Sequence, residues 1–75
     1  MVVEVFGQDY CMACKATKRW LDENEIDYTY HDIQKDSVAL DKVMALGYGG
    51  VPVVVTPNLH WQGFSLPNLK KLKRN

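Results

Sequence analysis

The sequence predicts an α/β domain in which helices flank a four-stranded mixed sheet, with elements in the order β-α-β-α-β-β-α. Two short runs of β-branched and aromatic residues flank a segment of helical polarity, which is typical of parallel strands joined through a helix. A second helical segment follows, and a proline-initiated apolar run then leads through a turn to a short strand and a last helix. Because 75 residues suffice for one small core, we expect a single domain over residues 1–75.

The first half of the chain is expected to hold two strands with a helix between them. Residues 2–6, VVEVF, predict a buried strand that ends at Gly7. Small or apolar residues then recur at helical spacing, at Ala13, Ala16, Thr17, Trp20 and Leu21. Asn24 suits the end of this helix, and residues 27–33, DYTYHDI, alternate in polarity as a second strand does.

A second helix is expected between Asp36 and Gly47. Asp36 can cap its first turn, and Gly47 can adopt the left-handed conformation that ends many helices. The apolar positions repeat at helical spacing, at Ala39, Leu40, Val43 and Met44.

The last part of the chain predicts a hairpin and a helix. Residues 51–55, VPVVV, form the third strand, and Pro52 belongs at its start because proline gives a ladder no N–H. Residues 59–62 form the fourth strand after a TPN turn. Ser65 can cap a last helix with Pro67 in its first turn, and the apolar face follows at Leu66, Leu69 and Leu72.

Composition excludes several classes of function. The chain has 9 Lys and Arg against 9 Asp and Glu, so it lacks the basic excess that nucleic-acid binding requires. No apolar run approaches the roughly 20 residues of a membrane span. The N-terminal MVVEVFG has no basic region, which argues against a signal peptide. We therefore expect a cytoplasmic protein, in a compartment where thiols stay reduced.

The two cysteines, Cys11 and Cys14, form a Cys-x-x-Cys pair with three possible roles. A structural zinc site needs four ligands, and His31 and His60 lie far from each other and from the pair, so no metal is expected. A structural disulfide over so short a loop gains little in the chain-entropy account and is rare in the cytoplasm. Reversible redox chemistry fits the pair best.

Local physics favours the redox role. Cys11 falls where the first helix begins, and there the free N–H groups and the helix dipole stabilise a thiolate, the attacking species in thiol–disulfide exchange. Cys14 lies one turn further on the same side of the helix, so it can displace a mixed disulfide from Cys11 at high effective concentration.

The segments CMAC, GYGGVPVVV and HWQGF resemble the NrdH-type redoxins, and the resemblance covers essentially the whole chain. These are small glutaredoxin-like proteins with the thioredoxin fold that behave functionally like thioredoxins. The resemblance implies a thiol–disulfide oxidoreductase that donates electrons to class Ib ribonucleotide reductase. It also implies re-reduction by thioredoxin reductase with NADPH, and we expect a monomer without a cofactor.

The resemblance also assigns residues. Cys11 is the exposed nucleophile, Cys14 is the resolving thiol, and Pro52 is a cis-proline that faces the disulfide. The backbone of Val51 pairs with a bound partner strand. The expected partner surface is completed by Tyr10, Met12, Ala13, Trp61, Gly63 and Phe64.

Some side chains admit two interpretations. Trp61 and Phe64 lie either in the core or on a partner surface, which exposure decides. Glu4 is either a proton acceptor for Cys14 or a polar residue at a sheet face, and the second fits better because glutamate is rarely buried unpaired.

Two positions distinguish the chain from glutathione-dependent glutaredoxins. These commonly carry a lysine where this chain has Gln8, and a Gly-Gly-x-Asp-Asp run where it has QGFSL with Ser65. Glutathione carries two carboxylates, so losing these groups favours a protein partner. The alternatives are a glutathione-dependent glutaredoxin and a non-redox binding module that uses the Trp61–Phe64 surface.

Overall fold

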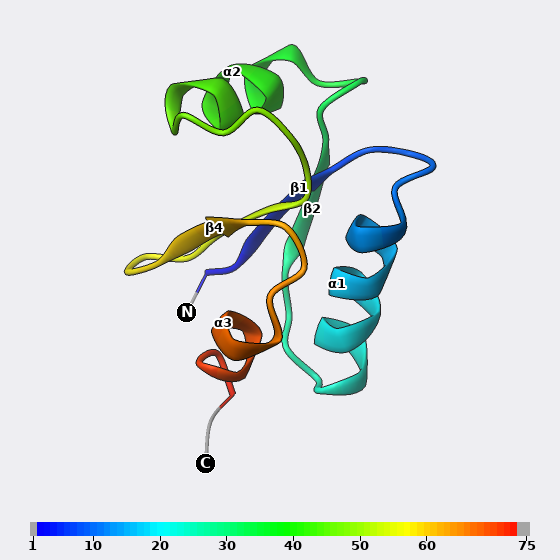
Figure 1. Cartoon of the computed structure of the whole chain (residues 1–75), viewed down its shortest axis with the longest axis vertical. Helices are drawn as coiled ribbons and strands as arrows, with labels where there is room; N and C mark the ends of the chain where they lie inside the picture. Colours follow the sequence, from blue (N-terminus) through cyan, green and yellow to red (C-terminus); the bar gives the residue numbers. More distant parts are fainter. Residues whose placement is uncertain (1, 74–75) are drawn as a thin grey trace.

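The computed structural model describes residues 2–73, and within that range the strands form one four-stranded mixed sheet in the order β2-β1-β3-β4. The predicted element order is confirmed (Figure 1). The elements are β1 (Glu4–Gly7), α1 (Met12–Glu23), β2 (Thr29–Asp32), α2 (Ser37–Ala45), β3 (Val53–Val55), β4 (His60–Gln62) and α3 (Leu66–Lys70). Within residues 2–73, no helix is both long and apolar enough to cross a membrane.

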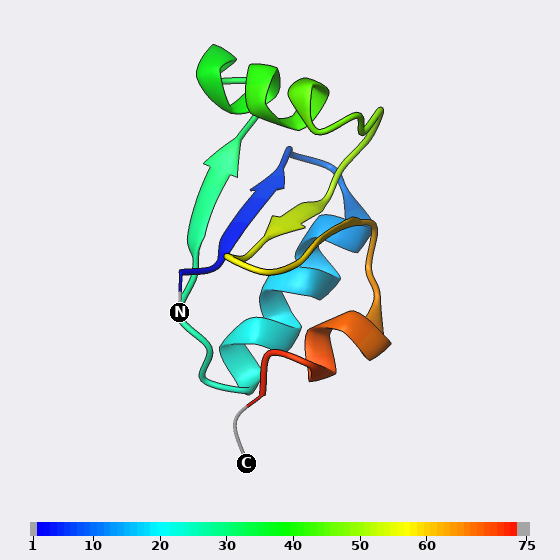
Figure 2. The ribbon, with the colours of Figure 1, turned by 90° about the vertical axis from the view of Figure 1, so that its left-hand side faces the viewer.

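Strand β1 lies inside the sheet. Its Val5 is paired with Tyr30 of β2 in parallel and with Val54 of β3 in antiparallel register. Figure 2 shows β2, β1 and β3 side by side. β1 covers residues 4–7 rather than the expected 2–6, because the ladder with β2 extends through Gly7, whose carbonyl accepts from the N–H of Ile33 at 2.9 Å.

The two faces of the sheet carry separate apolar clusters, and α1 and α3 lie on one side with α2 on the other (Figure 1). Alternation along β1 sends Val5 to the first cluster and Phe6 to the second. The buried members of the first are Val3, Val5, Leu21, Val54, Trp61, Leu69 and Leu72. Those of the second are Phe6, Ala39, Val43 and Val53.

The helix ends follow the predicted capping residues. Asp36 accepts hydrogen bonds from two backbone N–H groups in the first turn of α2. Gly47 follows that helix with a φ of 89°, a conformation that glycine adopts without steric cost. Ser65 caps α3 through the N–H of Asn68.

Glu4 lies on the α2 side of the sheet, where it accepts from His31 Nε2 at 2.9 Å and from Lys42 Nζ at 3.0 Å. Phe6 stacks on His31, with ring centroids 4.8 Å apart. Because neighbouring strand residues face opposite sides, Glu4 points away from Gly7 and the sulfur of Cys14 beneath it. The preferred interpretation of Glu4 as a sheet-face residue is therefore confirmed.

Replacing Glu4 with glutamine is expected to lower the free energy of unfolding by at most about 1 kcal/mol at neutral pH, since partly exposed ion pairs contribute little. Partial burial alone raises the pKa of Glu4, but the hydrogen bonds and charges of Lys42 and His31 bring that pKa below its ordinary value of 4.5. A lowered folded pKa stabilises the protein above pH 4.5, and this contribution disappears as the pH falls through the folded pKa. Urea denaturation at neutral and acidic pH measures the difference, and an equal loss at both would contradict this origin.

Candidate active site

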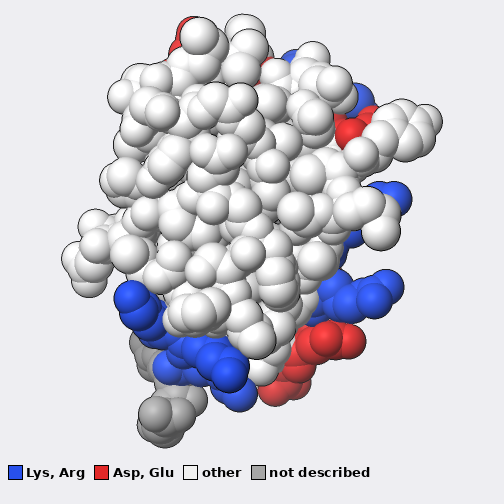
Figure 3. Space-filling model, viewed as in Figure 1, with Lys and Arg blue, Asp and Glu red and all other residues white. Residues whose placement is uncertain are grey.

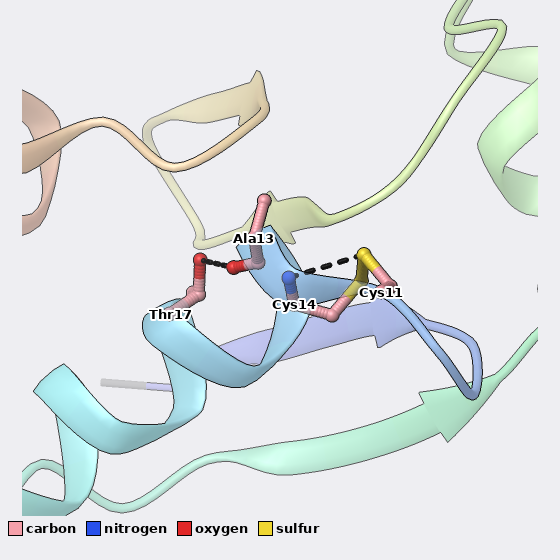
Figure 4. The surroundings of a disulfide bond; sticks show 4 residues. All are labelled: Cys11, Ala13, Cys14 and Thr17. Atoms are coloured by element: carbon pink, nitrogen blue, oxygen red, sulfur yellow. Dashed lines mark hydrogen bonds between the residues drawn. A yellow bond between two sulfur atoms is a disulfide. The ribbon is translucent and has the colours of Figure 1, made fainter.

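The site is built at the start of α1, where Cys11 is the N-cap residue. Cys11 has extended backbone angles, φ −114° and ψ 106°, and its Sγ accepts a hydrogen bond from the N–H of Cys14 at 3.1 Å (Figure 4). The sulfur therefore occupies the position that an oxygen acceptor takes in most N-caps. In the reduced protein, the same N–H and the positive end of the helix dipole stabilise a thiolate on Cys11.

The two cysteines form a disulfide, with their Cα atoms 5.2 Å apart. Cys14 is only 1% exposed, whereas Cys11 is partly exposed. An incoming sulfur nucleophile can therefore reach the disulfide at Cys11 rather than at Cys14.

Thr17 fixes the turn that contains the cysteines. Its fully buried hydroxyl donates to the carbonyl of Ala13 at 2.8 Å, one helical turn earlier (Figure 4). This hydrogen bond satisfies a polar group that would otherwise be costly to bury. The helical spacing predicts Thr17 on the buried helix face, but no sequence pattern indicates this hydrogen bond.

Tyr10 and Met12 flank Cys11 and leave their side chains in solvent, at 97% and 80% exposure. Tyr10 also has a φ of 59°, in the left-handed region that a non-glycine residue occupies at a cost of about 1–2 kcal/mol. An aromatic side chain is thus held outward next to the accessible sulfur.

The Val51–Pro52 peptide bond is cis, which confirms the prediction for this proline. Pro52 is buried, and its carbonyl accepts from the N–H of Gly63 at 2.7 Å. Gly63 has a φ of 90°, which glycine tolerates best. Figures 2 and 4 show the segment that enters β3 beside the first turn of α1. Val51 and Pro52, which directly precede β3, therefore lie at the end of the sheet where α1 begins.

Trp61 and Phe64 have different environments. Trp61 is 6% exposed and lies in the core between the sheet and helices α1 and α3. Phe64, in contrast, is 44% exposed. The expectation that Trp61 lines a partner surface is wrong, because the alternation of β4 turns this middle residue inward, opposite Val54. Leu66 is a further exposed apolar residue near Phe64 in sequence, at 38% exposure, although the helical spacing predicts it on the apolar face of the last helix.

Gly7 and Tyr30 are residues of the site that sequence analysis missed. A Cβ placed on Gly7 would lie 2.8 Å from the Tyr30 hydroxyl oxygen and 3.1 Å from Cys14 Sγ. Gly7 therefore leaves open a space that both the Tyr30 hydroxyl and the buried Cys14 sulfur border. A glycine that ends a strand on the helix-facing side was the available signal, but only the register of β1 with β2 identifies Tyr30.

Charged groups avoid a broad part of the surface. In the view of Figure 3, Lys and Arg side chains gather near the end of α3 and along α1, while the surface over β4 and α2 is mainly uncharged. Within residues 2–73, no group of three or more His, Cys, Asp or Glu side chains is placed to hold a metal ion.

Comparisons with known proteins match this arrangement. The glutaredoxin family model matches residues 3–61. The glutaredoxin-like protein NrdH of Lactococcus lactis subsp. cremoris (strain MG1363) is 32% identical over 71 residues, covering 95% of this chain and 99% of that protein. The NrdH protein of Escherichia coli (strain K12) is 26% identical over 72 residues, covering 96% and 89%.

Solved structures show the same fold. The NrdH-redoxin of Escherichia coli, described as a glutaredoxin-like protein with a thioredoxin-like activity profile, superposes with a TM-score of 0.95 at 25% identity, covering 100% of this chain and 99% of that one. A glutaredoxin from Archaeoglobus fulgidus gives a TM-score of 0.78 at 28% identity, covering 93% and 83%. The expected thioredoxin fold is confirmed.

Proposed function

Because the chain belongs to the glutaredoxin family and is a thiol–disulfide oxidoreductase, we propose that it carries electrons as a dithiol to a disulfide in a protein partner. The proposed partner is class Ib ribonucleotide reductase, and the proposed reductant is thioredoxin reductase with NADPH. The observation that carries the proposal is the Cys11–Cys14 disulfide at the start of α1, with one sulfur accessible and the other buried.

The reaction proceeds in two exchanges. The Cys11 thiolate attacks one sulfur of the partner disulfide, the other partner sulfur leaves as a thiolate, and a mixed disulfide forms. The Cys14 thiolate then attacks Cys11 Sγ and releases the second partner sulfur. Two electrons have passed to the partner, and the Cys11–Cys14 disulfide remains for the reductase.

Exposed apolar groups support a protein as the partner. Tyr10, Met12 and Phe64 leave large apolar side chains in solvent, and exposed apolar surface often marks an interaction site. We assign the rest of the partner contact to Ala13, the backbone around Val51, Pro52 and Gly63. Tyr10 has a costly left-handed backbone, yet its side chain is exposed and gains no packing in return. This combination fits a residue that is held outward to contact a partner.

The choice of reductant rests on similarity and on Gln8. The Escherichia coli NrdH-redoxin is described as having a thioredoxin-like activity profile, and this chain matches it over its length. Gln8 supplies no cation for a glutathione carboxylate. We place the carrier in the cytoplasm, where dithiols stay reduced. We further propose that it acts as a monomer, with a single domain over residues 1–75 and no bound cofactor.

The test is NADPH oxidation during reduction of insulin disulfides, run once with thioredoxin reductase and once with glutathione plus glutathione reductase. We expect turnover with thioredoxin reductase and only background with glutathione. Turnover with glutathione alone would make the chain a glutathione-dependent glutaredoxin. Turnover no faster than background with either reductant would instead favour a non-redox binding module, because the protein would then carry no electrons to a disulfide.

Tyr10→Ala is expected to raise the KM of thioredoxin reductase for this protein about tenfold, because an exposed aromatic anchor contributes strongly to a protein interface. The rate at which the reduced variant reduces a small-molecule disulfide should not change. Met44→Ala is the matched control, since Met44 is an exposed apolar residue, 64% exposed, on α2 across the sheet. Equal KM values for the two variants would remove Tyr10 from the partner surface.

A further inference from the structure

Tyr30 of β2 places a polar hydroxyl near the buried sulfur of the disulfide. The Tyr30 hydroxyl and Cys14 Sγ lie 2.8 Å and 3.1 Å from the same point, the position of a Cβ on Gly7. Tyr30 reaches this point from β2, where it is paired with Val5, and its ring packs against the core cluster on the α1 side. The hydroxyl and the sulfur are therefore at most 5.9 Å apart, and residue 7 has no side chain to fill the space next to both.

Cys14 needs such a neighbour when the disulfide opens. Its side chain is 1% exposed, so a thiolate there has little access to water. Burial disfavours a charged group unless a hydrogen-bond donor stabilises it. The helix start supplies part of that stabilisation, and a phenolic O–H is able to supply more.

Tyr30 is suited to donate rather than to accept. Burial, followed by the charges of Asp32 and Asp9, raises its pKa above 10.0, so its hydroxyl keeps its proton at physiological pH. Lys18 Nζ lies 3.9 Å from the ring centroid and holds the ring through a cation–π contact. The charged groups that surround the phenol are therefore Asp9 before α1, Lys18 on α1 and Asp32 at the end of β2.

We propose that the Tyr30 hydroxyl donates a hydrogen bond to the Cys14 thiolate whenever the Cys11–Cys14 bond is open. This rests on the proposed role of Cys14 as the resolving thiol. When a reductase thiolate attacks Cys11 Sγ, a new S–S bond forms to Cys11 and the electron pair of the old bond moves to Cys14 Sγ. The phenolic proton stays on oxygen and is shared with this sulfur, so no further reactant is needed.

The hydrogen bond has two consequences for the reaction. It lowers the pKa of Cys14 and so increases the fraction of thiolate available to resolve a mixed disulfide. It also makes Cys14 a better leaving group when the reductase attacks, since a thiol of lower pKa leaves faster.

Tyr30→Phe tests the proposal because it removes the hydroxyl and keeps the ring and its contact with Lys18. In a Cys11→Ser background, Cys14 is the remaining thiol, and the Cβ chemical shift of carbon-13-labelled Cys14 reports its pKa by NMR. We expect Tyr30→Phe to raise that pKa by about one unit, the size of one hydrogen bond to a charged group. Tyr28→Phe, at another half-buried tyrosine of the same core, is the control and should shift it by less than about 0.2 units.

A second measurement uses the protein with both cysteines. Reduction of the Cys11–Cys14 disulfide by dithiothreitol is expected to be about threefold slower in Tyr30→Phe, because the leaving thiolate is less stabilised. An unchanged or lowered Cys14 pKa in Tyr30→Phe would overturn the proposal, as would an equal shift in Tyr28→Phe. Neither measurement involves a protein partner, so failure here is distinct from a failure of turnover with thioredoxin reductase.

Discussion

Cys11→Ser is expected to reduce insulin no faster than the reaction without the protein. Serine has no sulfur to form the mixed disulfide, so the first exchange cannot take place. The remaining Cys14 is not expected to substitute, because its side chain is 1% exposed. The measurement is NADPH oxidation in the coupled assay with thioredoxin reductase.

Cys14→Ser is the matched variant and should lose steady-state turnover for a different reason. Cys11 still attacks a disulfide, but no thiol follows to resolve the product. Thermal unfolding of both reduced variants and the reduced wild type controls for folding. Turnover by folded Cys11→Ser comparable to that of the wild type would contradict the assigned role of Cys11.

Trp61→Ala is expected to lower the free energy of unfolding by about 3–5 kcal/mol, the usual cost of truncating a large buried aromatic residue. Trp61 is 6% exposed and packs in the cluster that joins the sheet to α1 and α3. A loss of this size is a large part of the stability of a small domain. Urea denaturation of the reduced protein measures it.

Two further variants separate core packing from surface contact. Trp61→Phe should cost less than Trp61→Ala, because it keeps a ring and removes an indole Nε1 that is buried without a hydrogen-bond partner among residues 2–73. Phe64→Ala should change the free energy of unfolding by less than about 1.5 kcal/mol, since Phe64 is 44% exposed. A larger loss in Phe64→Ala than in Trp61→Ala would contradict the assignment of Trp61 to the core.

Much of the fold could be predicted because local signals agreed with one another. Asp36 and Ser65 cap helices as expected, and Gly47 follows the end of α2 in the left-handed region. Each of these signals acts within a few residues of itself. The strand over residues 2–6 was misplaced by two positions at its start because ladder pairing, rather than composition, sets strand ends.

The site could be predicted where its chemistry is local and not where it depends on tertiary contacts. Cys11 and Cys14 share one helical turn, so their spacing was sufficient to predict a disulfide-forming pair. The approach of Tyr30 and Cys14 to Gly7 depends on strand register and on where α1 packs, which no short stretch of sequence encodes. The burial of Trp61 likewise depends on which face of β4 turns inward.

The most direct test of the account is to determine which cysteine bonds to the partner. Cys14→Ser and Cys11→Ser are each reduced and mixed with the proposed partner, oxidised class Ib ribonucleotide reductase. The products are analysed by intact-mass and peptide mass spectrometry. The account predicts a stable adduct through Cys11 in Cys14→Ser and none in Cys11→Ser. An adduct through Cys14 in Cys11→Ser, with none in Cys14→Ser, would reverse the assigned roles and contradict the proposed mechanism.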